Sequence, residues 1–170
     1  MTRFLPPLLL ALAATFALAP ASSQTSSLKG HNSNAPVDVA ADRIEVQDRA
    51  DRAVFSGNVI VRQAEMTLTA ARMTVAYLNS GHVAIKRIDA SGGVTVTSPS
   101  ERAKGDFGIY DLDRKIVTLI GGVSLVRAGN QVSGGRLVID LDSGRAVMDG
   151  GGPGSGGRVR GTFTVPQRRD

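Results

Sequence analysis

Hydrophobic and polar residues alternate along most of the chain, and the alternation is clearest over residues 55–77. Val59 and Val61 share one face there, and Leu68 and Val75 occupy the same kind of position further on. A period of two is typical of a strand with one buried face. Breaks at residues 62–65 and 70–72 predict short antiparallel strands of about five to seven residues, joined by tight turns.

A glycine-valine step repeats along the chain. It occurs at residues 57–59, 92–94 and 121–123, and Gly150 stands at the matching place of a fourth unit. A period of about 30 residues predicts strand units that bury their apolar faces only by stacking on each other. A recurring glycine fits a bulge or bend. The prediction is an all-β fold of about 15–16 short antiparallel strands, with no helix after residue 35.

The ends of the chain differ in composition from the middle. Residues 1–21 combine Arg3, an apolar run and a small-residue site at Ala19–Ala21, which is typical of a cleaved secretory signal peptide; a retained membrane anchor is the alternative. The polar residues 22–35 predict a flexible leader, and residues 36–149 the β domain. Residues 150–157 predict a glycine-rich linker, and residues 158–170 a last strand followed by a charged tail.

Composition narrows the function. Loss of Arg3 with the signal peptide lowers the formal net charge from +5 to +4, which suits an acidic partner such as phosphate or an anionic lipid. Nucleic acid is not expected, because no aromatic residues accompany the basic ones. The absence of cysteine excludes disulfides, thiolate metal sites and cysteine nucleophiles.

Catalytic and metal sites are not expected. The pairs Asp111/Asp113 and Asp140/Asp142 are 29 residues apart, the spacing of the repeat, so we interpret them as turn residues. His31 and His82 have no second histidine nearby. We therefore predict a binding protein without a cofactor, not an enzyme.

The inward face of the strands is predicted to be aliphatic. It forms either a closed core or, because the side chains are of modest size and no Trp fills the centre, an apolar groove. The predicted inward residues are Ile44, Val46, Val59, Val61, Met66, Leu68, Met73, Val75, Val94, Val96, Phe107, Ile109, Val117, Leu119, Val123, Leu125, Leu137, Ile139 and Val147.

Two segments carry a family resemblance. Residues 36–43 (PVDVAADR) and 55–63 (FSGNVIVRQ), with the repeated Gly-x-Val steps, resemble the LptA/OstA family of periplasmic lipopolysaccharide-transport proteins over about residues 36–150. Ala64 replaces a glycine that is usual in the family, and Ala71 replaces the aspartate of a second "AD". Neither change removes an inward apolar position.

The resemblance implies a twisted, V-shaped β-jellyroll in the periplasm whose interior holds the acyl chains of lipopolysaccharide. It also implies end-to-end strand pairing with an inner-membrane LptC-like jellyroll and an outer-membrane LptD-like translocon, and leaves head-to-tail self-association open. The expected pairing edges include Val37, Val39, Ala41, Ile139, Leu141 and Val147. The candidates for holding lipid A phosphates are Arg62, Lys86, Arg87, Arg114 and Lys115.

Two alternatives remain at this point. One is a sister jellyroll of the same pathway with a different role. The other is a structural β-solenoid or adhesin module with a closed core.

Overall fold

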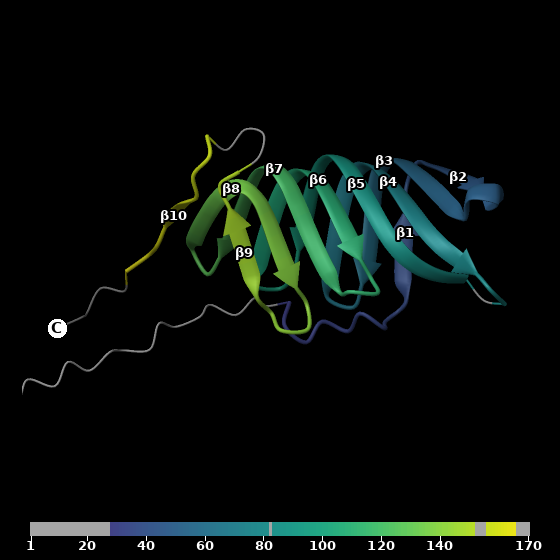
Figure 1. The fold of residues 1–170 in the computed structure, drawn as a ribbon, viewed down its shortest axis with the longest axis horizontal. Helices are drawn as coiled ribbons and strands as arrows, with labels where there is room; N and C mark the ends of the chain where they lie inside the picture. The colour runs from purple at the N-terminus through teal and green to yellow at the C-terminus, as the bar shows by residue number, and fades with distance from the viewer. Residues whose placement is uncertain (1–27, 82, 152–155, 166–170) are drawn as a thin grey trace, which may run out of the picture.

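The chain folds into one antiparallel β-sheet, bent over on itself (Figure 1). The structure is a computed structural model that describes residues 28–81, 83–151 and 156–165. The predicted signal peptide, residues 22–27 of the leader, His82, residues 152–155 of the glycine-rich linker and the last five residues lie outside the described part. The strands are β1 (Val37–Ala40), β2 (Arg43–Gln47), β3 (Arg52–Gln63), β4 (Met66–Asn79), β5 (Val83–Thr97), β6 (Glu101–Asp111), β7 (Ile116–Arg127), β8 (Asn130–Asp140), β9 (Ala146–Asp149) and β10 (Arg160–Thr162), with a 3-10 turn, η1, at Asp48–Ala50.

From β2 to β9, consecutive strands are neighbours in the sheet. The order is β1-β3-β4-β5-β6-β7-β8-β10, while β2 pairs with the other half of β3 and β9 with the other half of β8. Every pairing is antiparallel. The predicted all-β antiparallel fold is therefore confirmed, but the described residues form ten strands, not 15–16.

The strand count differs because the repeated glycines bend strands and do not begin them. Gly57, Gly92 and Gly121 lie inside β3, β5 and β7, with φ of 78°, 83° and 83°. The strand register shifts beside each of them, as expected for a β-bulge. A predicted pair of short strands is thus one long strand with a bulge in the middle.

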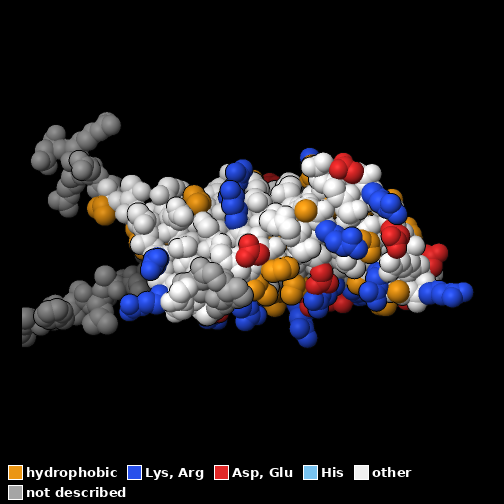
Figure 2. All heavy atoms as spheres, turned by 90° about the horizontal axis from the view of Figure 1, so that it is seen from above, with side chains coloured by type: hydrophobic (Ala, Val, Ile, Leu, Met, Phe, Trp, Pro, Cys, Tyr) orange, Lys and Arg blue, Asp and Glu red, His pale blue; other side chains and the backbone are white. Residues whose placement is uncertain are grey.

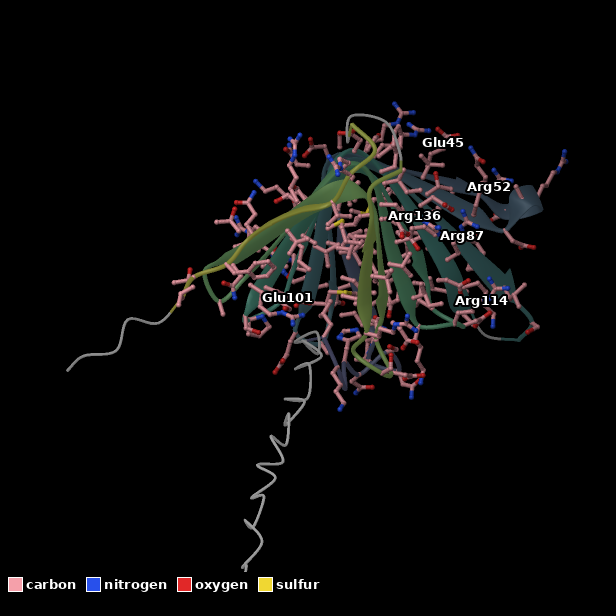
Figure 3. All side chains as sticks on the ribbon, turned by 60° about the vertical axis from the view of Figure 1, so that its left-hand side comes forward. Glu45, Arg52, Arg87, Glu101, Arg114 and Arg136 are labelled. Carbon is pink, nitrogen blue, oxygen red and sulfur yellow. The ribbon has the colours of Figure 1, made fainter. Side chains whose placement is uncertain are left out.

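The bulges divide the long strands into two arms, which diverge from the bend as a V (Figure 3). Arm 1 holds the halves of the long strands that adjoin β1 and β10, and arm 2 holds the halves that adjoin β2 and β9. In Figure 3, Glu101 lies near the free end of arm 1 and Arg114 near the free end of arm 2. We call these free ends the lips and the space between them the mouth.

An aliphatic core fills the inside of the V. On arm 2, Met73, Leu119 and Leu137 belong to one row of cross-strand neighbours, and each is fully buried. On arm 1, Val61 and Leu68 are opposed in the same way. Inward apolar rows on both arms explain why the sheet closes on itself without a helix.

Three residues predicted to face inward do not. Phe107 is 56% exposed, Ile109 is half-buried, and both lie on the outer face of arm 2. The bulge between Lys104 and Phe107 shifts the register of β6, so the inward residues are Gly108 and Tyr110.

Val147 of β9 is the third. It pairs with Val138, which pairs with Thr118 opposite Ile109, so Val147 belongs to the same outward row as Ile109.

The closed side of the V carries mixed charges. Figure 2 shows basic and acidic side chains interspersed there, with only small groups of hydrophobic side chains at the surface. The described part of this face shows no broad apolar patch in that view, so the apolar surface of interest lies inside the V.

Two terminal segments pack against the long strands, and the second of them adds a strand to the sheet. Residues 28–35, predicted to be a flexible leader, instead run along the mouth (Figure 1), and Leu28 is 3% exposed. A strand is predicted within residues 158–165, and β10 forms there, with Gly161 opposite Val132 of β8.

Candidate functional site: an apolar interior with two ends and a mouth

The interior of the V is the candidate site, and most of the predicted lining faces it. These residues are buried, except Leu125, which is half-buried against the core: Val59, Val61, Met66, Leu68, Met73, Val75, Val94, Val96, Val117, Leu119, Val123, Leu125, Leu137 and Ile139. Side chains fill the middle of the interior, where Met73, Val117 and Leu119 have no exposed surface. The interior is therefore a closed core there in this conformation.

At the N-terminal end the inner apolar face continues into solvent. Ile44 and Val46 lie in the same rows as Met73 and Val75, so their predicted inward direction is correct. They are nevertheless 56% and 57% exposed, because β2 is the last strand of arm 2 at this end. Their exposure leaves apolar surface for a neighbouring molecule to cover.

At the C-terminal end a cavity of about 130 Å³ opens between the arms. Leu125 and Val132 line it from arm 1, and Leu137, Ala146 and Met148 line it from arm 2. This end thus exposes inward-facing side chains of both arms.

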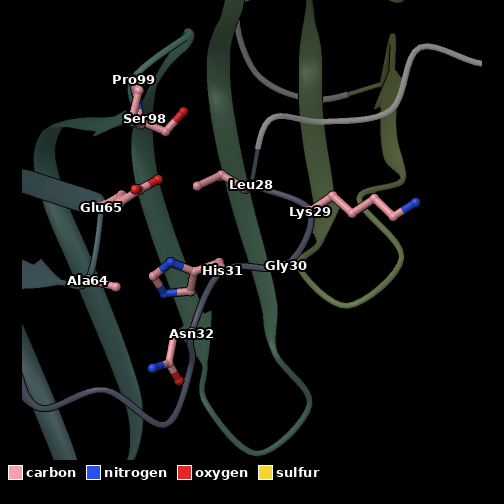
Figure 4. Close-up of a pocket in the computed structure, with 9 residues that line it drawn as sticks. All are labelled: Leu28, Lys29, Gly30, His31, Asn32, Ala64, Glu65, Ser98 and Pro99. Carbon is pink, nitrogen blue, oxygen red and sulfur yellow. The ribbon is translucent and has the colours of Figure 1, made fainter.

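A second cavity, of about 240 Å³, lies at the mouth (Figure 4). One wall is formed by Leu28–Asn32, and the other by the β3–β4 turn at Ala64–Glu65 and the β5–β6 turn at Ser98–Pro99. Residues 28–35 therefore lie against the lip of arm 1.

Polar side chains meet beneath this segment. The hydroxyl of Tyr110, on arm 2, donates a 2.7 Å hydrogen bond to Oε1 of Gln63, on arm 1, and Nε2 of His31 lies 3.1 Å from the same oxygen. Nε2 of Gln63 donates to the carbonyl oxygens of Ser33 and Ala35, at 2.8 and 3.0 Å.

Tyr110 is 1% exposed, and its burial raises the pKa of the phenol. The two arms are thus joined by a buried hydrogen-bond network at the mouth. Nothing in the sequence pattern indicated this role for Gln63, although the residue ends the FSGNVIVRQ motif.

A buried ion pair stabilises the lip of arm 1. Nη2 of Arg127 lies 2.6 Å from Oε2 of Glu101, whose side chain is almost fully buried. Glu101 and Arg127 are direct cross-strand neighbours in β6 and β7. A buried charge is retained only with such a partner.

The five predicted phosphate-binding residues separate into two groups. Arg62 is exposed on arm 1, opposite Asp38 and Thr67. The other four lie at or near the lip of arm 2, and each is ion-paired in this structure: Lys86 with Asp113, Arg87 with Asp89, Arg114 with Asp111 and Lys115 with Asp142.

The aspartate pairs are turn residues, as predicted. Oδ1 of Asp111 accepts a hydrogen bond from the backbone N–H of Arg114, and Oδ1 of Asp140 accepts from those of Asp142 and Ser143. The hydrogen bond from the backbone N–H of Ser143 contributes most to a lowered pKa of Asp140, and the bond from Asp142 adds to it. Within the described residues no group of three or more His, Cys, Asp or Glu side chains is placed to hold a metal ion.

The predicted pairing edges need correction. Val37 and Val39 lie on the edge strand β1, Ala41 follows it, and Val147 lies on the edge strand β9. Ile139, however, lies on β8 between Val117 and Ala146, and Leu141 is buried after β8, so neither is at an edge. The prediction failed there because β9 pairs with this half of β8 and because the backbone of Leu141 bonds to Gly30 and Lys115.

These features define an open β-jellyroll: one bent antiparallel sheet with an apolar interior and an uncovered edge at each end. The model of the family "LptA/(LptD N-terminal domain) LPS transport protein" matches residues 38–145. The chain belongs to this family of lipopolysaccharide-transport proteins, which are not enzymes.

The region that matches this chain makes up very different shares of its relatives. An uncharacterized protein of Rhizobium meliloti (strain 1021) is 33% identical over 156 residues, covering 88% of this chain and 82% of that protein. The LPS-assembly protein LptD of Yersinia enterocolitica is 34% identical over 88 residues, which is 51% of this chain but only 11% of LptD.

The fold also matches a solved structure. LptH of Pseudomonas aeruginosa, described as the LptA-homologous periplasmic component of a lipopolysaccharide transport device, superposes with a TM-score of 0.70. The match is 20% identical and covers 79% of this chain and 99% of LptH, so it shows the shared fold. No helix in the described part of this chain is long and apolar enough to cross a membrane.

Proposed function

We propose that this protein is an exported periplasmic bridge that carries lipopolysaccharide between the two membranes, with the acyl chains of lipid A held between the arms. The observation that supports this most is the inward apolar surface, which continues through β3 to β8 and reaches both ends of the sheet. The charged lip of arm 2 is the proposed contact for the phosphates, with Lys86, Arg87, Arg114 and Lys115.

The physical need for such a path is large. Exposing an acyl chain to water costs about 0.8 kcal/mol per CH₂ group, so a lipid with several chains does not cross an aqueous compartment unaided. When an acyl chain lies between the arms, side chains such as Met73 and Leu119 lose contacts with each other and gain contacts with the methylene groups of the lipid. The two kinds of contact are chemically alike. Opening the V is therefore offset by the lipid that fills it.

The edges support the bridge. β1 and β2 at one end, and β9 and β10 at the other, each have one side without a partner strand in the described structure. Exposed sheet edges pair readily with other strands. The proposed partners are an LptC-like jellyroll of the inner membrane, an LptD-like translocon of the outer membrane, and a second copy of this chain.

Photocrosslinking at neighbouring residues tests the lipid path. Leu68 points inward and is 2% exposed, whereas the adjacent Thr67 points outward from the same strand. A photoreactive residue at position 68 is expected to capture lipopolysaccharide in cells, and one at position 67 is not.

The packed middle of the interior also fits a structural module with a closed core. Equal capture at positions 67 and 68, or none at either, would contradict the lipid path, and organic extraction of the purified protein would then yield no bound lipid.

A further inference from the structure

The segment of residues 28–35 connects the two lips of the V. Its Gly30 N–H donates to the carbonyl oxygen of Leu141, which follows β8 at the lip of arm 2, at 3.3 Å. The backbone carbonyl oxygens of Ser33 and Ala35 accept hydrogen bonds from the side-chain amide of Gln63, at the lip of arm 1. We call this segment the strap.

The strap contributes a side chain to the interior. Leu28 is 3% exposed and belongs to the same core cluster as Met66 and Leu141. Lys29, the next residue, is exposed (Figure 4). An isobutyl group therefore occupies apolar space at the mouth that resembles, in size and chemistry, a short piece of an acyl chain.

The polar contacts explain how the strap is held. Gln63 is 1% exposed and uses its amide for both strap carbonyls and for Tyr110 of the opposite arm. The strap and the contact between the arms therefore share one side chain. Because the strap is bonded to Gln63 on one arm and to Leu141 on the other, separation of the arms to admit a bulky ligand breaks the Gln63–Tyr110 bond and pulls on the strap in the same step.

Unlike the mouth, the two ends of the interior are not covered by a segment of the described chain. Ile44 and Val46 are exposed at one end, and a cavity opens at the other. Only the long side of the V, the side through which a lipid with several chains and a large polar headgroup could enter sideways, is crossed by a segment of the chain within the described residues.

We propose that the strap guards a lateral acyl-chain site: an acyl chain enters between the lips, displaces residues 28–35 and takes the position of the Leu28 side chain. This inference rests on the proposed function. The ligand class is a saturated acyl chain attached to an anionic headgroup, and the headgroup stays outside, beside the lip of arm 2.

Shortening Leu28 tests the competition. The probe is purified lipopolysaccharide with a fluorescent label, titrated into the exported chain. Leu28→Ala is expected to tighten binding by about threefold to tenfold, because a larger share of molecules then has the site free. Val126→Ala is the matched control, since that aliphatic side chain is 41% exposed on the outer face of arm 1, next to the inward Leu125; it is expected to bind as the unaltered chain does.

A distance measurement keeps the test independent of stability. The chain has no cysteine, so nitroxide labels attach only where cysteines are introduced. Labels at Lys29→Cys and Glu65→Cys report on the strap against arm 1, and lipopolysaccharide is expected to lengthen and broaden that distance. Labels at Glu65→Cys and Arg102→Cys, both exposed on arm 1, are the control pair and are expected to stay fixed.

The outcomes separate the two proposals. If lipopolysaccharide binds but Leu28→Ala leaves the affinity unchanged and the strap distance stays fixed, the strap inference is wrong and the proposed function stands. If neither the unaltered chain nor Leu28→Ala binds lipopolysaccharide, the proposed function fails and the strap inference fails with it.

Discussion

Tyr110 is the most unusual side chain of the interior, because it places a hydroxyl among aliphatic groups. It is 1% exposed, and its hydrogen bond to Gln63 satisfies the hydroxyl. A buried polar group without that bond would be costly. Tyr110 therefore fixes the separation of the arms at the mouth more specifically than an aliphatic residue would.

The raised pKa of Tyr110 predicts a loss of stability in alkali. A group whose pKa is higher in the folded than in the unfolded state contributes stability that is present below the unfolded pKa, near 10.0, and is lost as pH rises through the folded pKa. We expect urea unfolding of Tyr77→Phe, in which Tyr110 is the sole tyrosine, to show a declining free energy above pH 10.

The double variant Tyr77→Phe/Tyr110→Phe is the control. It is expected to lose about 1 kcal/mol at neutral pH, the value of one hydrogen bond, but to decline less steeply in alkali. Parallel alkaline slopes for the two proteins would show that the Tyr110 hydroxyl does not govern this loss.

Residue-level prediction from the sequence worked for most of the lining and failed at Phe107, Ile109 and Val147. Val59, Leu68 and Val117 were placed on the correct face because alternation is strict within each half-strand. Phe107 and Ile109 were misplaced because the bulge in β6 inverts the faces, and the more hydrophobic pair then lies outside. Alternation alone does not reveal such an inversion.

At the scale of the strand, paired glycines mark where β5 and β7 bend. Gly92 and Gly93 both have positive φ, at 83° and 78°, but their surroundings differ. A Cβ at Gly92 would lie 2.7 Å from the Cβ of Ala71, whereas a Cβ at Gly93 would meet nothing within 4 Å. Ala71 of β4 therefore faces the bend of β5.

These surroundings predict different costs for two adjacent substitutions. Gly93→Ala is expected to destabilise the fold by about 1–2 kcal/mol, through the left-handed backbone alone. Gly92→Ala is expected to cost about 1–3 kcal/mol more, because the added methyl group also overlaps Ala71. Urea unfolding measures the loss of unfolding free energy for both variants. Equal losses would mean that β4 moves away at Ala71 to accommodate the added methyl group, with no loss of stability.

The strands themselves were only partly predictable. The glycine spacing correctly located three of the bends, at Gly57, Gly92 and Gly121, because neighbouring strands must bend at the same level to keep both arms paired. Gly150, the expected fourth, follows the end of β9. Whether a glycine ends a strand or bends it depends on pairing with the next strand, which a local pattern does not contain. Short predicted strands were therefore joined into strands of 11 to 15 residues in β3 to β8.

At the scale of the whole molecule, the strap was the main surprise. Residues 28–35 are polar and contain Asn, Ser and Gly, so a flexible leader was the natural prediction. The partners that order them, Gln63 and Leu141, are distant in sequence. Only the assembled mouth supplies those hydrogen bonds, and no periodicity in the segment could have indicated them.

The arrangement of the strands also fits stacking of the whole molecule. β2 runs antiparallel to β3, and five antiparallel pairings lead from β3 to β8, so β2 and β8 run in the same direction. β9 runs antiparallel to β8 and hence to β2. A second copy placed after β9 can therefore add its β2 as the next antiparallel strand, which continues arm 2 without a break.

This direction predicts a specific crosslink between two copies. Val147 of β9 and Glu45 of β2 lie at opposite ends of one outward row of arm 2, so head-to-tail stacking brings Glu45 of one copy beside Val147 of the next. We expect a mixture of the Glu45→Cys and Val147→Cys proteins to form disulfide-linked dimers, visible on a non-reducing gel. Each protein alone should give few dimers, and Arg102→Cys, exposed near the lip of arm 1 on β6 and away from both sheet edges, should give none with either. Dimers of Glu45→Cys alone would instead indicate pairing of like edges, which closes after two copies and cannot extend into a bridge.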